Sequence, residues 1–542
     1  ISGRARDTRI SSLKTVTASA ASGKAGGFAG FAKAGDALSA GDSTTSKLTG
    51  IELENLLGVV SALRPEFNNT SIAYVSNGND PQVSADMAGG FVGDGQAVDI
   101  NYGNNNSGFK ADTDTNITGL SYIKGTSYAG GFAGRLMPGD VAQTGSIKLL
   151  GLLNVNQLLS VMDVAYPRIS DSSIEGDSLV VTASGKNDDV VLGDAGGYIG
   201  NGKAVMLKNS DVTNVKEVKA PYHAGGYIGI MRSGSAAEAG DATGDLLNSV
   251  LGKILSLKEL ASVLQAASSK ITNCKVAGTA DGLTVTADSG FENAEGYAGG
   301  FVGEMQSGHV DNSANAVDSG KGTAVENLLK VEGLRYAGGF GGLVKAGAVA
   351  EIGAKSSILT KVVDLTGLLS LVNAFVPVIS NASVNSVEKG FTVTVTGTLE
   401  KDSTNDADAG SAGGFIGCGT GVQISNSDVN KLQHTGVSEP KNLQQEDGSS
   451  YYGSDSAYAV SGYRYAGGYI GKAAMGSTAA IGGASVLDKV LSASNLLSAL
   501  TVVASIIDSS DVYGATGGFN VLATDGDGDT GKAGGYAGEL LG

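Results

Sequence analysis

Three aspartates at alternate positions form the segment of the chain best suited to binding a metal ion. Asp525, Asp527 and Asp529 lie in a Gly-rich stretch, and carboxylates at this spacing resemble the start of a calcium loop. The pattern is incomplete, because Thr530 stands where such a loop has Gly and no Glu follows at its twelfth position. A solvated acidic turn is the simpler interpretation. Calcium is the alternative, and it is the one cofactor that the sequence suggests.

A second candidate is a set of aromatic residues at one position of a repeated hexapeptide. Its members are Phe28, Phe91, Phe132, Tyr198, Tyr227, Phe301, Phe340, Phe415, Tyr469 and Tyr536. If they face outwards, the rings form a stripe on which sugar rings or a partner surface could stack. Because aromatic burial dominates core energetics, we instead expect them to pack beneath the insertions described below. Residues alternate between the two faces of a regular strand. Burying both the ring and the next residue therefore needs either a bulge in the strand or an insertion that covers the ring.

Residues typical of catalysis are sparse. His223, His309 and His434 lie in unlike contexts, and the sequence has neither a His-Glu-x-x-His motif nor a Gly-x-Ser-x-Gly elbow with a supporting His. Cys274 and Cys418 are too few to staple 542 residues, and we expect both to be buried small residues rather than disulfide-bonded or reactive thiols. The sequence therefore predicts no catalytic residues and no enzyme.

The composition narrows the classes of partner. The chain has 54 acidic and 37 basic side chains, a net charge of −17. A chain this acidic repels a phosphate backbone, so nucleic acid is not an expected partner. No run of about 18 apolar residues occurs, which predicts no membrane span in this segment. With 84 Gly but 41% hydrophobic residues, the chain is expected to fold rather than to form a flexible linker.

Self-similarity is the strongest signal in the sequence. The hexapeptide Ala-Gly-Gly-aromatic-x-Gly occurs ten times, beginning at Ala25, Ala88, Ala129, Ala195, Ala224, Ala298, Ala337, Ala412, Ala466 and Ala533. Long and short spacings mostly alternate, so we group the copies into pairs. The grouping predicts one continuous repeat solenoid over residues 1–542, with superrepeats at approximately 25–128, 129–223, 224–336, 337–465 and 466–542. Both ends fall within the pattern, so we expect a segment of a longer chain.

The copies share a core, and alternate copies carry an insertion. In the short copies, an apolar strand, a Gly-bearing turn and an Asn-Ser pair precede a second alternating strand. In the others, apolar residues three or four positions apart separate the two halves, as in Leu247, Val250 and Leu251, which predicts one face of a helix. Corresponding stretches run through Leu56–Leu63, Leu149–Val164, Leu365–Phe375 and Val486–Ile506.

The short copies resemble a known motif. The stretch Gly-Gly-Phe-Val-Gly-Glu-Met-Gln-Ser-Gly-His-Val-Asp-Asn-Ser, which begins at Gly299, is similar to the GLUG motif of large secreted and surface-exposed bacterial proteins, including adhesins and the non-catalytic parts of surface proteases. Phe or Tyr stands here where that motif has its namesake Leu. The resemblance implies a mainly β chain folded as a right-handed parallel β-helix, or β-solenoid, on a bacterial cell surface. It covers the ten units but not the insertions.

A parallel solenoid also explains the composition. Equivalent residues stack at about 4.8 Å along the axis, so each corner reuses the residue type that suits it. Gly fits corners with positive φ or close backbone approach. Asn tolerates the left-handed conformation and bonds to its own turn, which predicts an Asn or Asp ladder at one corner. The α-helical insertions cannot continue the coil, and we expect them to form a ridge along it.

These patterns predict a non-catalytic structural or adhesive repeat region of a large bacterial cell-surface protein or extracellular filament. The expected partners are neighbouring repeats or further copies of the protein, and host or cell-surface proteins or glycans. One alternative is a carbohydrate-binding β-helix module, which an exposed aromatic row would favour. Another is a β-helix polysaccharide lyase or hydrolase, which two close carboxylates in a groove would favour.

Overall fold

The chain is almost entirely β-structure. The computed structural model describes residues 3–34, 64–102, 115–139, 163–187, 191–234, 268–288, 296–315, 321–347, 376–397, 409–433, 442–444, 450–452, 458–476, 504–515, 518–524 and 531–541. Among these residues, helical conformation is confined to residues 163–165 and the short 3₁₀ helix η1 (Ser313–Asn315). The predicted mainly β class is therefore confirmed.

Sheet 1 consists of ten parallel three-residue strands. Its strands, in order, are β1 (Arg4–Arg6), β6 (Glu66–Asn68), β10 (Asp99–Asn101), β13 (Arg168–Ser170), β19 (Met206–Lys208), β23 (Lys270–Thr272), β28 (His309–Asp311), β32 (Val378–Ser380), β37 (Gln423–Ser425) and β44 (Ile506–Asp508). An internal strand buries its middle residue, as Ile169 shows between its two half-buried neighbours. This alternation follows from the period of two in a β-strand.

Sheet 3 also has ten parallel strands, each of which begins at the fifth residue of a hexapeptide. They are β5 (Ala29–Lys33), β9 (Val92–Gln96), β12 (Ala133–Met137), β18 (Ile199–Lys203), β22 (Ile228–Arg232), β27 (Val302–Gln306), β31 (Gly341–Lys345), β36 (Ile416–Thr420), β43 (Ile470–Ala474) and β48 (Ala537–Leu540). Both sheets keep strict chain order, so every inner strand pairs with its equivalents in the preceding and following repeats.

Sheet 2 connects sheets 1 and 3 and contains the remaining parallel strands. They are β2 (Arg9–Leu13), β3 (Val16–Thr17), β4 (Lys24–Gly26), β7 (Ser71–Tyr74), β8 (Val83–Gly89), β11 (Thr115–Gly130), β14 (Ser173–Ala183), β17 (Asp194–Gly196), β20 (Val212–Ala220), β21 (His223–Gly225), β24 (Val276–Gly278), β25 (Leu283–Ala287), β26 (Tyr297–Gly299), β29 (Thr323–Gly333), β30 (Tyr336–Gly338), β33 (Ser383–Ser386), β34 (Thr392–Val395), β35 (Ser411–Gly413), β38 (Val429–Leu432), β41 (Val460–Gly462), β42 (Tyr465–Gly467), β45 (Val512–Gly514), β46 (Val521–Ala523) and β47 (Lys532–Gly534). Two antiparallel hairpins stand apart from the three sheets: β15 (Lys186–Asn187) with β16 (Val191–Leu192), and β39 (Asn442–Gln444) with β40 (Ser450–Tyr452).

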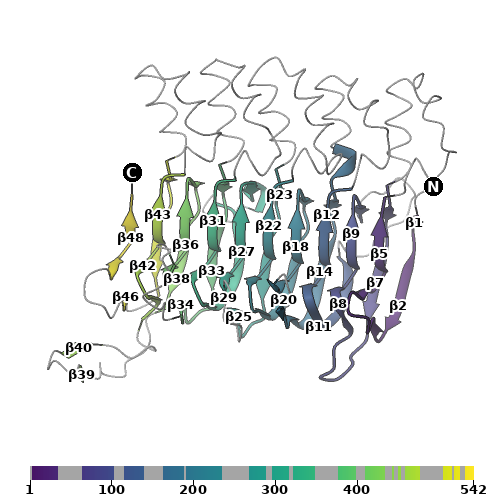
Figure 1. The fold of residues 1–542 in the computed structure, drawn as a ribbon, viewed down its shortest axis with the longest axis horizontal. Helices are drawn as coiled ribbons and strands as arrows, with labels where there is room; N and C mark the ends of the chain where they lie inside the picture. Colours follow the sequence, from purple (N-terminus) through teal and green to yellow (C-terminus); the bar gives the residue numbers. More distant parts are fainter. Residues whose placement is uncertain are drawn as a thin grey trace, which may run out of the picture.

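One passage of the chain through sheets 1, 2 and 3 is called a rung here, and the ten rungs are numbered from the N-terminus. Figure 1 shows them side by side along the long axis, from β2 and β5 at one end to β48 at the other. The hexapeptides stack in register, since Ala298 of rung 6 pairs with Ala224 of rung 5 and Ala337 of rung 7. Successive rungs therefore place identical residues against each other.

The connections from sheet 3 back to sheet 1 alternate in length. After β9, β18, β27 and β36 only two residues intervene, as in Ala204 and Val205. After the odd-numbered rungs the connections are long, and these hold the insertions that we expected to be helical. The predicted helical insertions fall outside the described residues, with two exceptions. Residues 163–165 are helical. At the end of the last insertion, Ile506 lies in β44 rather than in a helix.

A bend inside each hexapeptide separates sheet 2 from sheet 3. In rung 6, β26 ends at Gly299 and β27 begins at Val302, so strand alternation restarts after Phe301. Phe301 and Val302 are both buried in the core, which resolves the conflict that strict alternation posed. The Gly residues permit this bend sterically, because a Cβ on Gly225 would lie 1.8 Å from the carbonyl oxygen of Ile228.

The corner between sheets 1 and 2 has a left-handed backbone. The residues there with φ between 47° and 53° are Asp7, Asn69, Asp171, Asn209, Asn273, Asn381, Asn426 and Ser509. Their side chains also join rungs, since Asn209 Nδ2 donates to Asp171 Oδ1 at 2.8 Å and Asn273 Nδ2 donates to Asn209 Oδ1 at 3.3 Å. The predicted Asn or Asp ladder at one corner is confirmed, and its cause is the tolerance of these side chains for positive φ.

Candidate functional site

The aromatic residues of the ten hexapeptides form one column inside the stack. Neighbouring rings lie 4.8–5.1 Å apart with interplanar angles of at most 20°. The eight inner rings are fully buried, Phe28 is partly buried, and Tyr536 at the C-terminal end is 38% exposed. The rings cover one another within the core, so the inner part of the column offers no exposed stripe to a sugar.

Whether a rung has Tyr or Phe in the column correlates with the residue at the opposite corner of that rung. Four tyrosine hydroxyls each donate to a Ser carbonyl oxygen of their own rung: Tyr198 to Ser172 at 2.5 Å, Tyr227 to Ser210 at 2.5 Å, Tyr469 to Ser427 at 2.7 Å and Tyr536 to Ser510 at 3.0 Å. In three of the Phe rungs the equivalent corner residue is Thr70, Cys274 or Ala382. Burial raises the pKa of Tyr227 well above its ordinary value, so its hydroxyl stays a neutral donor.

Both cysteines are buried single thiols, as predicted. Cys274 stands at the corner position that Ser occupies in rungs 4 and 5, and its Sγ donates to the Thr272 carbonyl oxygen at 3.3 Å. Burial raises the pKa of the Cys274 thiol to about 12. Cys418 lies in sheet 3 and is 1% exposed. At neutral pH the Cys274 thiol is therefore protonated and sheltered from reagents.

Two rows of equivalent residues, with one residue from each rung, lie side by side along the edge shared by sheets 2 and 3. We call these two rows the seam. One row is the residue directly before each hexapeptide, and the other is the third residue of each sheet 3 strand. Their polar and aromatic members include Lys24, Tyr128, Asp194, His223, Tyr297, Tyr336, Tyr465 and Lys532 in the first row, and Asp94, Arg135, Asn201, Glu304, Lys472 and Glu539 in the second. Buried Asp94, for example, pairs with Lys24 at 2.6 Å and with Arg135 at 2.8 Å.

His223 is a buried ionisable group of the seam with partners on both sides. Its Nδ1 lies 2.7 Å from Asp194 Oδ1 and its Nε2 lies 3.0 Å from Glu304 Oε2. Lys345 approaches Glu304 from the far side at 2.7 Å, and the Tyr297 ring packs edge-on against the imidazole. Burial by itself raises the pKa of Glu304, but the hydrogen bond and charge of His223, together with Lys345, hold it well below the usual range. This arrangement fixes a charged carboxylate inside the structure.

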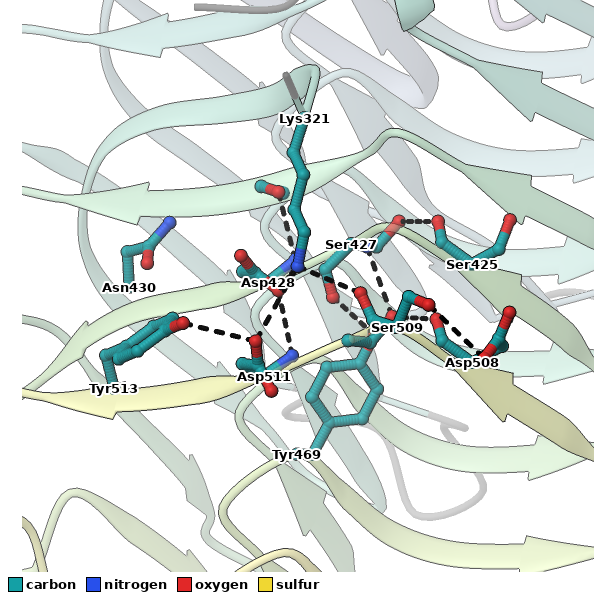
Figure 2. Close-up of polar contacts among 12 residues, drawn as sticks. Lys321, Ser425, Ser427, Asp428, Asn430, Tyr469, Asp508, Ser509, Asp511 and Tyr513 are labelled. Carbon is teal, nitrogen blue, oxygen red and sulfur yellow. Dashed lines mark hydrogen bonds and ion pairs between the residues drawn. The ribbon is translucent and has the colours of Figure 1, made fainter. Parts of the chain in front are cut away.

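A second polar cluster ties the last rungs together at the start of sheet 2 (Figure 2). Lys321, just before β29, donates to Asp428 Oδ1 at 2.7 Å and to the Ser509 carbonyl oxygen at 2.9 Å, and lies 3.7 Å from Asp511. Tyr513 donates to Asp511 Oδ2, the oxygen that also faces Lys321, at 3.1 Å. Burial alone would lower the pKa of Lys321, but the hydrogen bond and charges of the two aspartates raise it. The amine therefore stays protonated and joins rungs 7, 9 and 10 as a cation.

The remaining candidates from the sequence do not gather into one site. Asp525, Asp527 and Asp529 lie outside the described residues, as does His434. His309 lies in sheet 1 beside Lys270, and burial lowers its pKa. Within the described ranges, no group of three or more His, Cys, Asp or Glu side chains is placed to hold a metal ion. The same ranges contain no helix long and apolar enough to cross a membrane.

Sequence reasoning missed the seam and the Lys321 cluster. The position before each hexapeptide carries polar or aromatic residues in most copies, a signal that was available in the aligned repeats. The partners of Lys321, by contrast, lie 107 residues or more away and become neighbours only through the stacking of rungs.

No family model matches the chain, and comparisons with curated proteins and with solved structures likewise found no match.

Proposed function

We propose that the chain is a right-handed parallel β-helix with helical insertions in alternate repeats, and that it serves as a structural and adhesive region. In this proposal it belongs to a large bacterial cell-surface protein or extracellular filament and catalyses no reaction. The observation that carries the proposal is the unbroken register of the ten rungs in sheets 1 and 3, around one buried aromatic column. Parallel ladders running the whole length suit a rod that spans distance and bears force.

The polar groups support the same role. Asn209, Ser210 and Lys321 hold neighbouring or more distant rungs together, and His223 joins rungs 4, 5 and 6. The GLUG-like hexapeptides support the extracellular bacterial setting. Adhesion would fall to the insertions and loops, which vary in sequence between repeats, whereas the hexapeptide recurs in every rung. The burial of the column weighs against the carbohydrate-binding alternative, which needs exposed rings.

Two measurements test the proposal. Negative-stain electron microscopy of the purified chain should show rods, with a stack about 50 Å long for ten rungs at about 4.8 Å each. Antibodies raised against the chain should label intact cells of the source bacterium without permeabilisation. Compact globules in the micrographs would contradict the β-helix, and labelling only after cell lysis would contradict the surface location.

A further inference from the structure

In the middle of the stack, the seam encloses a histidine between two carboxylates. His223, Asp194 and Glu304 are 4%, 5% and 2% exposed. The histidine belongs to rung 5, whereas the carboxylates belong to β17 of rung 4 and β27 of rung 6. In rung 5 itself, the seam residue of sheet 3 is the buried Ile230. The imidazole therefore lies between charges that two other rungs supply.

These contacts favour a proton on each ring nitrogen. Nδ1 of His223 lies 2.7 Å from Asp194 Oδ1, and Nε2 lies 3.0 Å from Glu304 Oε2. An ionised carboxylate only accepts hydrogen bonds, and a neutral imidazole has a single N–H, so it can serve one of the two oxygens. Its other nitrogen would direct a lone pair at a negative charge. The imidazolium, which has two N–H groups and a positive charge, suits both contacts at once.

The two carboxylates depend on that positive charge to different degrees. Glu304 Oε1 also lies 2.7 Å from Lys345 Nζ, a second cation. Asp194 Oδ2 accepts a hydrogen bond from Asn201 Nδ2 at 2.8 Å, and this donor is neutral. If His223 lost one proton, Glu304 would keep the lysine, but Asp194 would lose the cation that lies against it. A buried charge without compensation is costly, so the seam at rungs 4 and 5 should loosen.

Aromatic rings enclose the cluster. The Tyr297 ring centroid lies 5.3 Å from that of the imidazole and the Tyr222 ring centroid lies 6.1 Å from it. The other charged groups along this part of the seam, which act on Tyr128 together with Asp194, are Arg135, Arg232 and Asp86. Because the three central groups are buried, water screens them little, and a change in the charge of the imidazole acts strongly on both carboxylates.

We propose that His223 is a pH-sensitive latch, which holds rungs 4, 5 and 6 together at the seam as an imidazolium and releases them when it loses a proton at alkaline pH. The ladders of sheets 1 and 3 stay paired, so the opening is confined to the seam. The sign follows from linkage, because a cation that the fold stabilises contributes stability at low pH and loses that contribution as the pH rises through its titration in the folded chain. The latch goes beyond the structural role proposed above and does not depend on a surface location.

NMR tests the protonation of the ring directly, because the chain contains only three histidines. In protein isotopically labelled at histidine Cε1, single His→Gln variants at positions 223, 309 and 434 assign the three signals. The His223 signal should still be that of an imidazolium at pH 8, where a histidine with the ordinary pKa of about 6.5 is almost entirely neutral. His309 is the internal control, since burial lowers its pKa and it should be neutral at this pH.

Hydrogen exchange read by mass spectrometry tests whether that proton holds the rungs together. As the pH rises through the His223 titration, amides of β17, β21 and β26 should lose up to about tenfold in protection for each unit by which the midpoint exceeds that of an ordinary histidine. Protection is corrected for the intrinsic effect of pH on exchange. Amides of β35 and β42 are the control and should not change, because Ser411 and Tyr465 occupy the His223 row there.

Variants separate the latch from general alkaline loosening. The double variant Asp194→Asn/Glu304→Gln should move the His223 midpoint below the ordinary value, because burial then acts without the two carboxylates. His309→Gln should leave the pH dependence of rungs 4–6 unchanged. A His223 signal in the wild type that titrates at or below the ordinary value would overturn the proposal, whether or not any variant folds. A loss of protection that persists in His223→Gln, or that is equal in rungs 8 and 9, would do the same.

Discussion

Replacing Phe301 by Ala should destabilise the middle of the stack by about 3–5 kcal/mol. The ring is completely buried and stacks on Tyr227 at 4.8 Å and on Phe340 at 5.1 Å. Each lost aromatic pair contributes about 0.5–1.5 kcal/mol beyond its area. Loss of the buried apolar surface adds about 1.5–3 kcal/mol. The two contributions together span the range expected for a Phe to Ala change in a core that cannot collapse around the cavity.

Hydrogen exchange read by mass spectrometry is the suitable assay, because a stack of rungs need not unfold in a single step. We expect amides of β26, β27 and β30 to lose the most protection, and amides several rungs away to lose little. Phe28→Ala is the matched control and should cost clearly less, since Phe28 is only partly buried. Equal losses for both variants, or a loss below about 1 kcal/mol for Phe301→Ala, would refute the continuous column as a source of stability.

Four further results are expected. Because the pKa of Glu304 is held below its ordinary value of 4.5, its charge stabilises the fold at any pH above 4.5. The free energy of unfolding should therefore fall as the pH drops below 4.5. In urea unfolding measured at a series of pH values, Glu304→Gln should make this fall shallower. Asn209→Ala should cost about 1 kcal/mol and Asn209→Gly less in thermal unfolding, because the residue has φ of 47°. Tyr227→Phe should cost about 1 kcal/mol in urea unfolding by leaving a buried Ser carbonyl without its donor. Cys274 should react with a thiol reagent at pH 8 only after denaturation, because burial raises its pKa to about 12.

Three of these expectations have a specific result that would contradict them. If the free energy of unfolding of Glu304→Gln fell as steeply below pH 4.5 as that of the wild type, His223 would not be holding the Glu304 carboxylate in its charged form. If Asn209→Gly destabilised the chain as much as Asn209→Ala, the corner would depend on the Asn side chain rather than on its backbone conformation. Rapid labelling of Cys274 in the native chain would mean that the corner opens readily.

The repeats predicted the rungs because identical neighbours demand identical residues. The hexapeptide alone was enough to locate ten equivalent aromatic residues, and the Asn at the opposite corner followed from its tolerance of positive φ. The place of the bend was harder to predict. Alternation suggested that Phe301 and Val302 face opposite ways, whereas the Gly residues let the chain turn between two sheets so that both enter the core.

The seam was harder to predict for a different reason, although the position before each hexapeptide carried a signal in the aligned repeats. Asp194, His223 and Glu304 belong to three successive rungs, and connections of unequal length separate them along the chain. Their contacts depend on the register of two sheets at once. A one-residue slip in either sheet would move its row to the other face and separate the charges. The aligned repeats mark one row of the seam, but they do not show which row of sheet 3 lies beside it.

The same register explains how the stack keeps charges in its interior. Inside the stack, each strand of sheets 1 and 3 is paired on both sides, and buried charges such as Glu304 have partners in adjacent rungs. Glu304 meets His223 of the rung before it and Lys345 of the rung after it. Its charge is therefore compensated only while three successive rungs keep their alignment, because an unpaired buried charge is costly.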